Sequence, residues 1–227
     1  GILRLGLLQT ALGAILVLTT STLNRVMVVE YAMPAAVPGL LVALHHACQA
    51  LRPRWGYASD RGGRRTPWIV GGMAVLAAGG LLAAIATAWM ATAPVAGLVL
   101  AVAAFVLIGL GVGAAGTNTL ILLAERVEDE RRAPAATIVW VMMIAGFIVT
   151  AALGGRALDP YSPERLIAVA AVVGLLAFLL SVVAVSGLEG SRRAGAPDAT
   201  SSRAERDGGF SAMLRTVWCD PVARRFT

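Results

Sequence analysis

Long apolar runs separated by short polar connections make up most of the first 186 residues of the chain. Six of these runs approach the length of about twenty residues that an α-helix needs to cross about 30 Å of hydrocarbon. They are Leu5 to Leu23, Pro34 to Leu51, Pro67 to Trp89, Val95 to Leu123, Ala135 to Leu153 and Leu166 to Ser186. The pattern predicts an all-α membrane protein with six transmembrane helices.

The pattern changes after residue 188. Residues 189–209 are polar, charged and rich in Ser, Ala and Gly, which is typical of a linker. Residues 210–227 place apolar side chains at a helical spacing among arginines, which predicts an interfacial amphipathic helix. We therefore expect a transmembrane bundle over 1–188, a cytoplasmic linker over 189–209, and an amphipathic lead-in over 210–227 to a further bundle.

Composition and charge support the membrane assignment. Hydrophobic residues make up 58% of the chain and charged residues 14%, which lies outside the range of ordinary soluble domains. The net charge is +6, but the arginines lie in connections and at helix ends, so we expect no nucleic-acid partner. An N-terminus inside leaves only Arg25, Arg156 and Arg165 of nineteen arginines outside. This asymmetry predicts a multi-pass membrane protein with a cytoplasmic N-terminus.

A short cationic stretch, Gly56 to Arg65, lies between the second and third apolar runs. Its glycines allow the backbone to turn, and Asp60 can pair with nearby guanidinium groups, so we expect a tight cytoplasmic turn. The spacing resembles the signature loop between helices 2 and 3 of the major facilitator superfamily. The positions that match this loop are Gly56, Asp60, Arg61, Gly63, Arg64 and Arg65. The resemblance implies the N-terminal six-helix bundle of a twelve-helix fold with a central cavity.

Charged residues near the end of the first run need partners in a membrane. Arg25 and Glu30 are five residues apart, so on one continuous α-helix their side chains would point about 140° apart and pair poorly. This spacing indicates either a break in the helix or partners on other helices. A position among the lipid headgroups and a role in the cavity both remain open.

Two adjacent histidines, His45 and His46, lie in the second run. Neighbouring helical residues point about 100° apart, so at most one imidazole faces a given cavity. A neutral imidazole there could ligate a metal centre, including the magnesium of a chlorin ring, or hydrogen-bond a neighbouring helix. Packing is the favoured interpretation.

The fourth run carries Gly109, Gly111, Gly113 and Gly116, whose spacing favours close helix packing. Asn118 follows in mid-span, where its amide needs a hydrogen-bond partner, and it is a candidate for lining the cavity. The mixed charges after this run predict cytoplasmic ion pairs with the arginines of the signature loop.

Catalytic and cofactor signals are missing from the sequence. It contains no glycine loop ending in Gly-Lys-Ser/Thr, no Cys/His cluster and no nucleophile beside a base. We therefore expect a protein that is not an enzyme and that binds neither a nucleotide nor a free metal ion.

Three stretches, Leu23 to Glu30, Gly56 to Ile69 and Gly109 to Arg126, together resemble the bacteriochlorophyll-delivery family of anoxygenic phototrophs, the PucC and LhaA type. The resemblance implies an assembly factor for light-harvesting complexes, with bacteriochlorophyll as bound cargo. The implied partners are antenna polypeptides, the reaction centre and pigment-synthesis enzymes, besides the lipid bilayer.

The resemblance also assigns candidate residues. Asn24, Arg25 and Glu30 match the family's first-span motif, whereas His45, His46 and Asn118 are candidates on chemical grounds. A secondary transporter that uses Arg25 or Glu30 for ion coupling is the alternative function. An enzyme acting on pigment precursors ranks last, because no catalytic group is evident.

Overall fold

The computed structural model describes residues 1–62 and 64–188, apart from the side chains at 61 and 62, and the regular elements in this part of the chain are all helical. The predicted linker and lead-in lie outside the described residues. The main helices are α1 (Ile2–Val17), α2 (Leu23–Arg25), α3 (Ala36–Cys48), α4 (Arg52–Gly62), α5 (Thr66–Trp89), α6 (Pro94–Arg126), α7 (Arg132–Ala157) and α8 (Pro163–Val185). Four short segments join or extend them: η1 (Leu18–Thr22), η2 (Val26–Glu30), η3 (Gln49–Leu51) and η4 (Asp129–Arg131).

Five helical runs in the described part of the chain are long and apolar enough to cross a membrane. They are Ile2–Glu30, Thr66–Trp89, Pro94–Arg126, Asp129–Ala157 and Pro163–Val185. The all-α membrane fold expected from the hydropathy pattern is thus confirmed, and five of the six predicted spans correspond to these runs.

The second predicted span, Pro34 to Leu51, is built differently. Its helix α3 has 13 residues, a length of about 20 Å, and continues through the 3₁₀ turn η3 into the polar helix α4. Gln49 and Arg52 interrupt the apolar sequence at this junction. The sixth member of the bundle is therefore a segmented helical run instead of one apolar helix.

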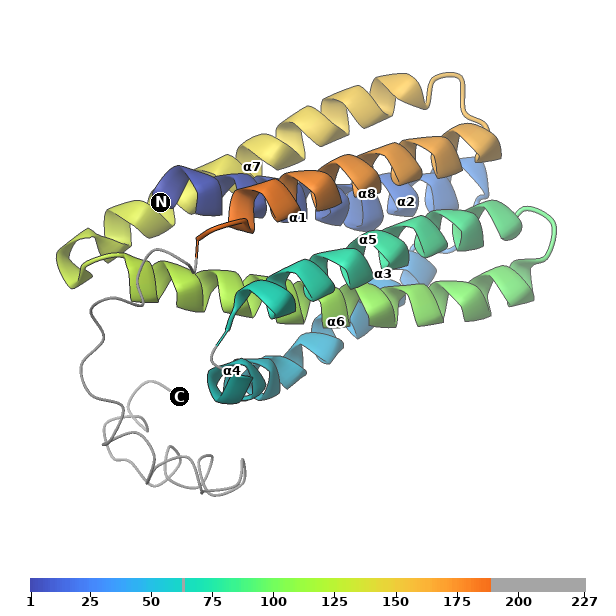
Figure 1. Ribbon diagram of the computed structural model, residues 1–227. Coiled ribbons are helices and arrows are strands. Elements are labelled where there is room, and N and C mark those ends of the chain that lie inside the picture. The colour runs from blue at the N-terminus through green and yellow to red at the C-terminus, as the bar shows by residue number, and fades with distance from the viewer. Residues whose placement is uncertain (63, 189–227) are drawn as a thin grey trace.

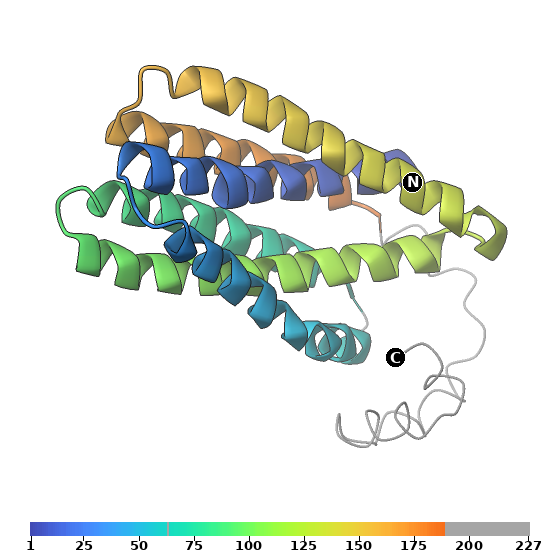
Figure 2. The same cartoon turned by 180° about the vertical axis from the view of Figure 1, so that it is seen from behind.

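The helices form two neighbouring groups that run roughly parallel along the molecule. In Figures 1 and 2, α7 and α8 lie beside α1, while α3 and α5 lie beside α6. Contacts of α5 with α8 and of α1 with α6 join the two groups. The N-terminus, helix α4 and the end of α8 lie at one end of the bundle, which we call the signature end. The turns from α5 to α6 and from α7 to α8 lie at the opposite end.

Four glycines in the middle of α6 each contact a different helix. A Cβ on Gly109 would lie 2.6 Å from the carbonyl oxygen of His45 in α3, and one on Gly111 would lie 2.6 Å from the backbone nitrogen of Leu76 in α5. Gly113 faces Trp55 of α4, and Gly116 faces Leu12 of α1. Side chains at the first two positions would push neighbouring backbones apart, so the predicted packing role of these glycines is confirmed.

The first span departs from regular α-helix at two points. Its segments η1 and η2 are π-helical turns, with α2 between them. The span ends where Ala32 adopts a left-handed conformation (φ 50°), which lets the amide of Met33 donate to the carbonyl of Met27 at 2.9 Å. π-Helical turns recur at functional sites, and these two flank the Asn24–Arg25 motif.

Candidate functional site

The signature segment is largely helical and not the tight turn that the sequence predicted. Residues 52–62 form α4, so the change of direction falls between Gly62 and Thr66. A Cβ on Gly56 would make ordinary contacts with Thr117 and Ile121 of α6, at 3.9 and 3.6 Å. Gly56 therefore lies in a helix–helix contact, and the prediction that it allows the backbone to turn is wrong. Gly63 and the side chain of Arg61 lie outside the described residues.

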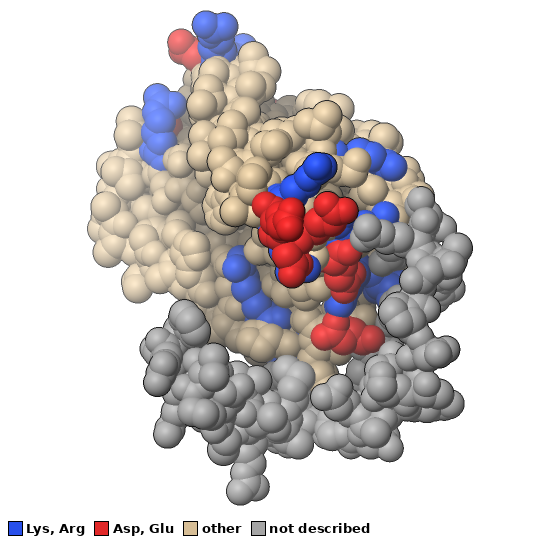
Figure 3. Space-filling view, turned by 90° about the vertical axis from the view of Figure 1, so that its left-hand side faces the viewer, with Lys and Arg blue, Asp and Glu red and all other residues tan. Residues whose placement is uncertain are grey.

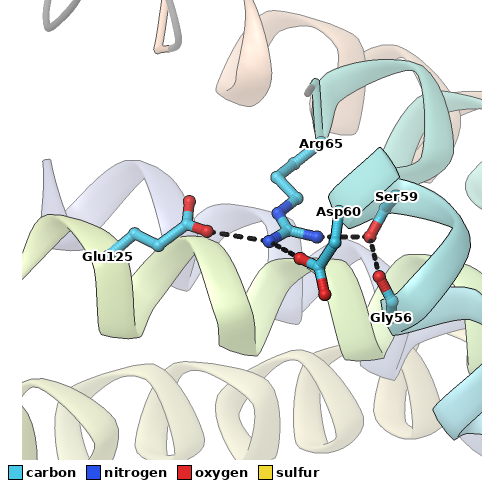
Figure 4. A network of polar contacts seen from close by, with 5 residues as sticks. All are labelled: Gly56, Ser59, Asp60, Arg65 and Glu125. Atoms are coloured by element: carbon cyan, nitrogen blue, oxygen red, sulfur yellow. Dashed lines mark hydrogen bonds and ion pairs between the residues drawn. The ribbon is translucent and has the colours of Figure 1, made fainter. Parts of the chain in front are cut away.

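Arg65 is the centre of a polar network at the signature end (Figure 4). Its guanidinium group pairs with Asp60 and donates to Ser59, both on α4. The same group donates to Glu125 near the end of α6 at 2.8 Å. The Ser59 hydroxyl in turn donates to the carbonyl of Gly56 at 2.8 Å. The network ties α4 and the start of α5 to α6. It confirms the predicted ion pairs of Asp60 and of the mixed-charge loop with an arginine of the signature segment.

The electrostatics of this network favour a charged Arg65. Burial alone lowers the pKa of Arg65, but the hydrogen bonds and negative charges of Glu125 and Asp60 outweigh burial and raise it above its ordinary value. Figure 3 shows acidic and basic side chains gathered together on this end of the bundle. Arg64 is exposed next to Arg65 and also interacts with other groups.

The end of the first span places its charged pair in contact. Arg25 Nη2 lies 3.9 Å from Glu30 Oε1, and both side chains are accessible, at 59% and 29% exposure. The intervening turn η2 is π-helical, which agrees with the first of the two alternatives that the spacing left open, a departure from one continuous α-helix. Asn24 lies beside this pair, and its Oδ1 is buried without a hydrogen-bond partner within the described residues.

The two histidines of α3 occupy different environments. His45 is buried where α3 meets Gly109, and Gln49 Nε2 donates to its Nε2 at 2.9 Å. His46 is exposed, and its only described polar contact is Nδ1 to Gln49 at 3.4 Å. His45 thus takes the packing role, while His46 is the imidazole that a ligand can reach.

Asn118 is fully buried within the bundle. Its Nδ2 donates to the carbonyl of Ala114 at 2.8 Å, and its Oδ1 has no partner among the described groups. Asn118 is therefore enclosed by its neighbours and does not line an open surface of the described structure.

Sequence reasoning missed two contributors. Ser59 is fully buried and orients Arg65, but its only sequence signal is a position directly before Asp60. Tyr161 shares a hydrogen bond between hydroxyls with Tyr31. Their rings pack edge to face with centroids 6.0 Å apart, and this contact ties the end of the first span to the connection between α7 and α8.

A bundle of membrane-length helices with an arginine–carboxylate network between α4, α5 and α6 defines a protein of the major facilitator fold. A solved structure of the same fold is the inward-open xylose transporter XylE from E. coli. It superposes with a TM-score of 0.60 over 99% of this chain and 53% of the transporter, at 17% sequence identity. This similarity concerns the fold alone.

The chain belongs to the PucC protein family, whose model matches residues 22–227. It is 52% identical over its whole length to the bacteriochlorophyll synthase 44.5 kDa chain of Rhodobacter capsulatus. It is 32% identical over 85% of its length to Protein PucC of Cereibacter sphaeroides. It covers 51% and 45% of these two relatives, so the chain spans about half the length of the curated relatives it matches.

Proposed function

We propose that this chain is part of an assembly factor for photosynthetic light-harvesting complexes, which binds bacteriochlorophyll or antenna polypeptides and does not alter the pigment covalently. The family match over residues 22–227 carries the proposal. A relative named for bacteriochlorophyll, at 52% identity, supports a role connected with this pigment.

We propose His46 as the residue that would hold the pigment through its magnesium. An exposed imidazole has the chemistry for this bond. The exposed residues one and two turns away on the same side are small: Gly39 and Ala43 on α3, and Ala50 in the following turn η3. They leave room for a macrocycle held against the helix. Asn24, Arg25 and Glu30 would then contact the polar groups of cargo at the other end of the bundle.

The decisive experiment is the absorption spectrum of the full-length protein purified from a pigment-producing host. We expect a far-red chlorin band that is lost in His46→Ala and kept in His45→Ala, because only the first imidazole is accessible. The two variants are matched, because they replace the same type of residue on the same helix. A colourless wild-type protein that also captures no antenna polypeptide would refute the proposed function.

Catalysis is the competing function, because one relative carries the word synthase in its name. Incubation of the purified full-length protein with chlorin precursors, followed by chromatography, separates the two. We expect the precursor to be recovered unchanged. A new pigment formed in proportion to time and protein would replace the binding proposal with an enzymatic one.

We further propose that the signature end, with Asp60 and Arg65, faces the cytoplasm of a bacterial inner membrane and that the antenna partners approach through the bilayer. The excess of arginines at this end supports this orientation. Labelling of single cysteines placed at Arg131 and at Arg156 in intact cells tests it. A membrane-impermeant reagent should reach only the second position.

A further inference from the structure

An apolar groove of about 620 Å³ runs between α7 and α8, with α1 as its floor. Val149 of α7 and Leu176 of α8 line it and are more than half exposed, so the groove opens to the surroundings of the bundle. Of its lining residues only Thr10 and Thr150 carry polar side-chain atoms. The Thr10 hydroxyl already donates to the carbonyl of Met142 at 2.9 Å. The lining therefore suits a hydrocarbon ligand.

The size of the groove decides what kind of hydrocarbon it can hold. Its walls run from Ala145 to Ala157 on α7 and from Ala168 to Leu180 on α8, a length of about 18 Å at the helical rise. The groove is long enough for one flexible chain through one leaflet, which is about half of the hydrocarbon thickness of roughly 30 Å.

Two arginines lie at the end of this groove, opposite the signature end. Arg165 continues the helical series of lining residues on α8, three positions before Ala168, and Arg156 precedes Ala157 on α7. Both are exposed. Arg165 Nη1 donates to the carbonyl of Pro160 at 2.9 Å, which fixes its position and leaves its charge uncompensated by that contact.

The acidic residues in the connection between α7 and α8 do not pair with these two arginines. Glu164 lies in the first turn of α8, where helix amides attract a negative charge, and its charge also acts on Tyr161. Asp159 is exposed in the turn. In the described part of the chain, neither carboxylate forms an ion pair with Arg156 or Arg165.

We propose that the groove binds one acyl chain of an anionic phospholipid, whose phosphate lies at Arg156 and Arg165. An apolar channel that leads to paired guanidinium groups complements an amphiphile with one negative charge at its head. The charge favours an anionic lipid over a zwitterionic lipid or a neutral isoprenoid. This site lies apart from α3 and does not depend on the pigment-binding proposal.

Native mass spectrometry of the full-length protein in detergent, titrated with phosphatidylglycerol or with phosphatidylcholine of identical chains, tests the site. We expect the wild type to prefer phosphatidylglycerol. Arg156→Gln should weaken the binding of phosphatidylglycerol roughly fivefold, as expected for the loss of one arginine near a lipid phosphate. It should weaken the binding of phosphatidylcholine less, because the choline cation offsets the charge of that phosphate. Arg131→Gln, at the signature end, is the charge-matched control and should change neither lipid.

A pair of neighbouring glycines tests the acyl-chain part. Gly154 lines the groove, where an added Cβ would lie 3.9 Å from Val169, whereas Gly155 faces open space. Gly154→Leu should therefore lower retention of both lipids, and Gly155→Leu should not. Equal binding of the two lipids by the wild type would overturn the headgroup assignment, and equal retention by the two leucine variants would overturn the groove.

Discussion

Arg25 and Glu30 form an ion pair, with 3.9 Å between Nη2 and Oε1, across a single π-helical turn. In a regular α-helix residues five apart point about 140° away from each other, so this contact depends on the wider winding of residues 26–30. The Arg25–Glu30 contact and the π-helical winding of the turn therefore occur together.

This pair should contribute little to stability. Both side chains are accessible, and exposed ion pairs contribute about 0 to 1 kcal/mol. In a double-mutant cycle of Arg25→Gln and Glu30→Gln, followed by thermal unfolding in detergent, we expect a coupling energy below about 1 kcal/mol. A coupling of twice that size would mean that the pair is desolvated in the whole protein.

Removal of Arg65 should destabilise the signature end. Arg65→Ala loses the contacts to Ser59, Asp60 and Glu125, but the two carboxylates are about half exposed and become solvated. We therefore expect a loss of about 1 to 2 kcal/mol in the free energy of unfolding. Hydrogen exchange should rise in α4 before it rises in α7. Arg131→Ala is the control, and equal effects of the two variants would contradict the network.

The glycines of α6 should differ sharply in their tolerance to substitution. Gly111→Ala would place a methyl group 2.6 Å from the backbone of Leu76 and should cost about 1 to 3 kcal/mol. Gly116→Ala would place it 3.8 Å from the side chain of Leu12, so the gain in helix propensity of up to about 1 kcal/mol should offset any strain. Thermal unfolding of the two variants in the same detergent measures the difference. Equal melting temperatures would contradict the close approach of α5 and α6.

Tyr161 should make the protein sensitive to alkaline pH. Burial, followed by the hydrogen bond to Tyr31 and the nearby charges, raises the pKa of Tyr161 above its ordinary value of about 10. The unfolded chain therefore releases the phenolic proton first, and the stabilisation is complete below about pH 10 and lost as the pH rises further. Melting curves from pH 8 to 11 should show this decline in the wild type.

Tyr161→Phe is the matched variant for that measurement. It should lower stability at pH 8 by about 0.5 to 1.5 kcal/mol through the lost hydrogen bond, and it should flatten the alkaline decline. Tyr57→Phe, at the signature end, provides the control. Parallel curves for the wild type and Tyr161→Phe would show that another group titrates.

Hydropathy was sufficient to predict the positions of five spans, because each is a long apolar helix whose length is set by the bilayer. It gave less information on Pro34 to Leu51, where polar residues near Gln49 divide the run into α3, η3 and α4. Composition reports apolarity over a window, whereas the segmentation depends on the local contacts of α3 and α4 with α6.

The candidate site shows the same division. Spacing alone indicated that Arg25 and Glu30 need either a break in the helix or partners on other helices, and the charge pattern indicated that Asp60 pairs with arginine. The helical state of Gly56 and the different exposure of His45 and His46 could not be predicted. Both are set by the packing of α3 and α4 against α6, which pairs residues more than fifty positions apart.

The arrangement of glycines along α6 has a consequence for biogenesis. The glycine positions that contact α1, α3, α4 and α5 all lie on α6, a helix that is synthesised after these four. The earlier segments therefore leave the ribosome before the surface that orders them exists. Until α6 enters the bilayer, they must be held by lipid or by the insertion machinery, and a pause in translation shortly before Pro94 would expose them to misassembly and degradation.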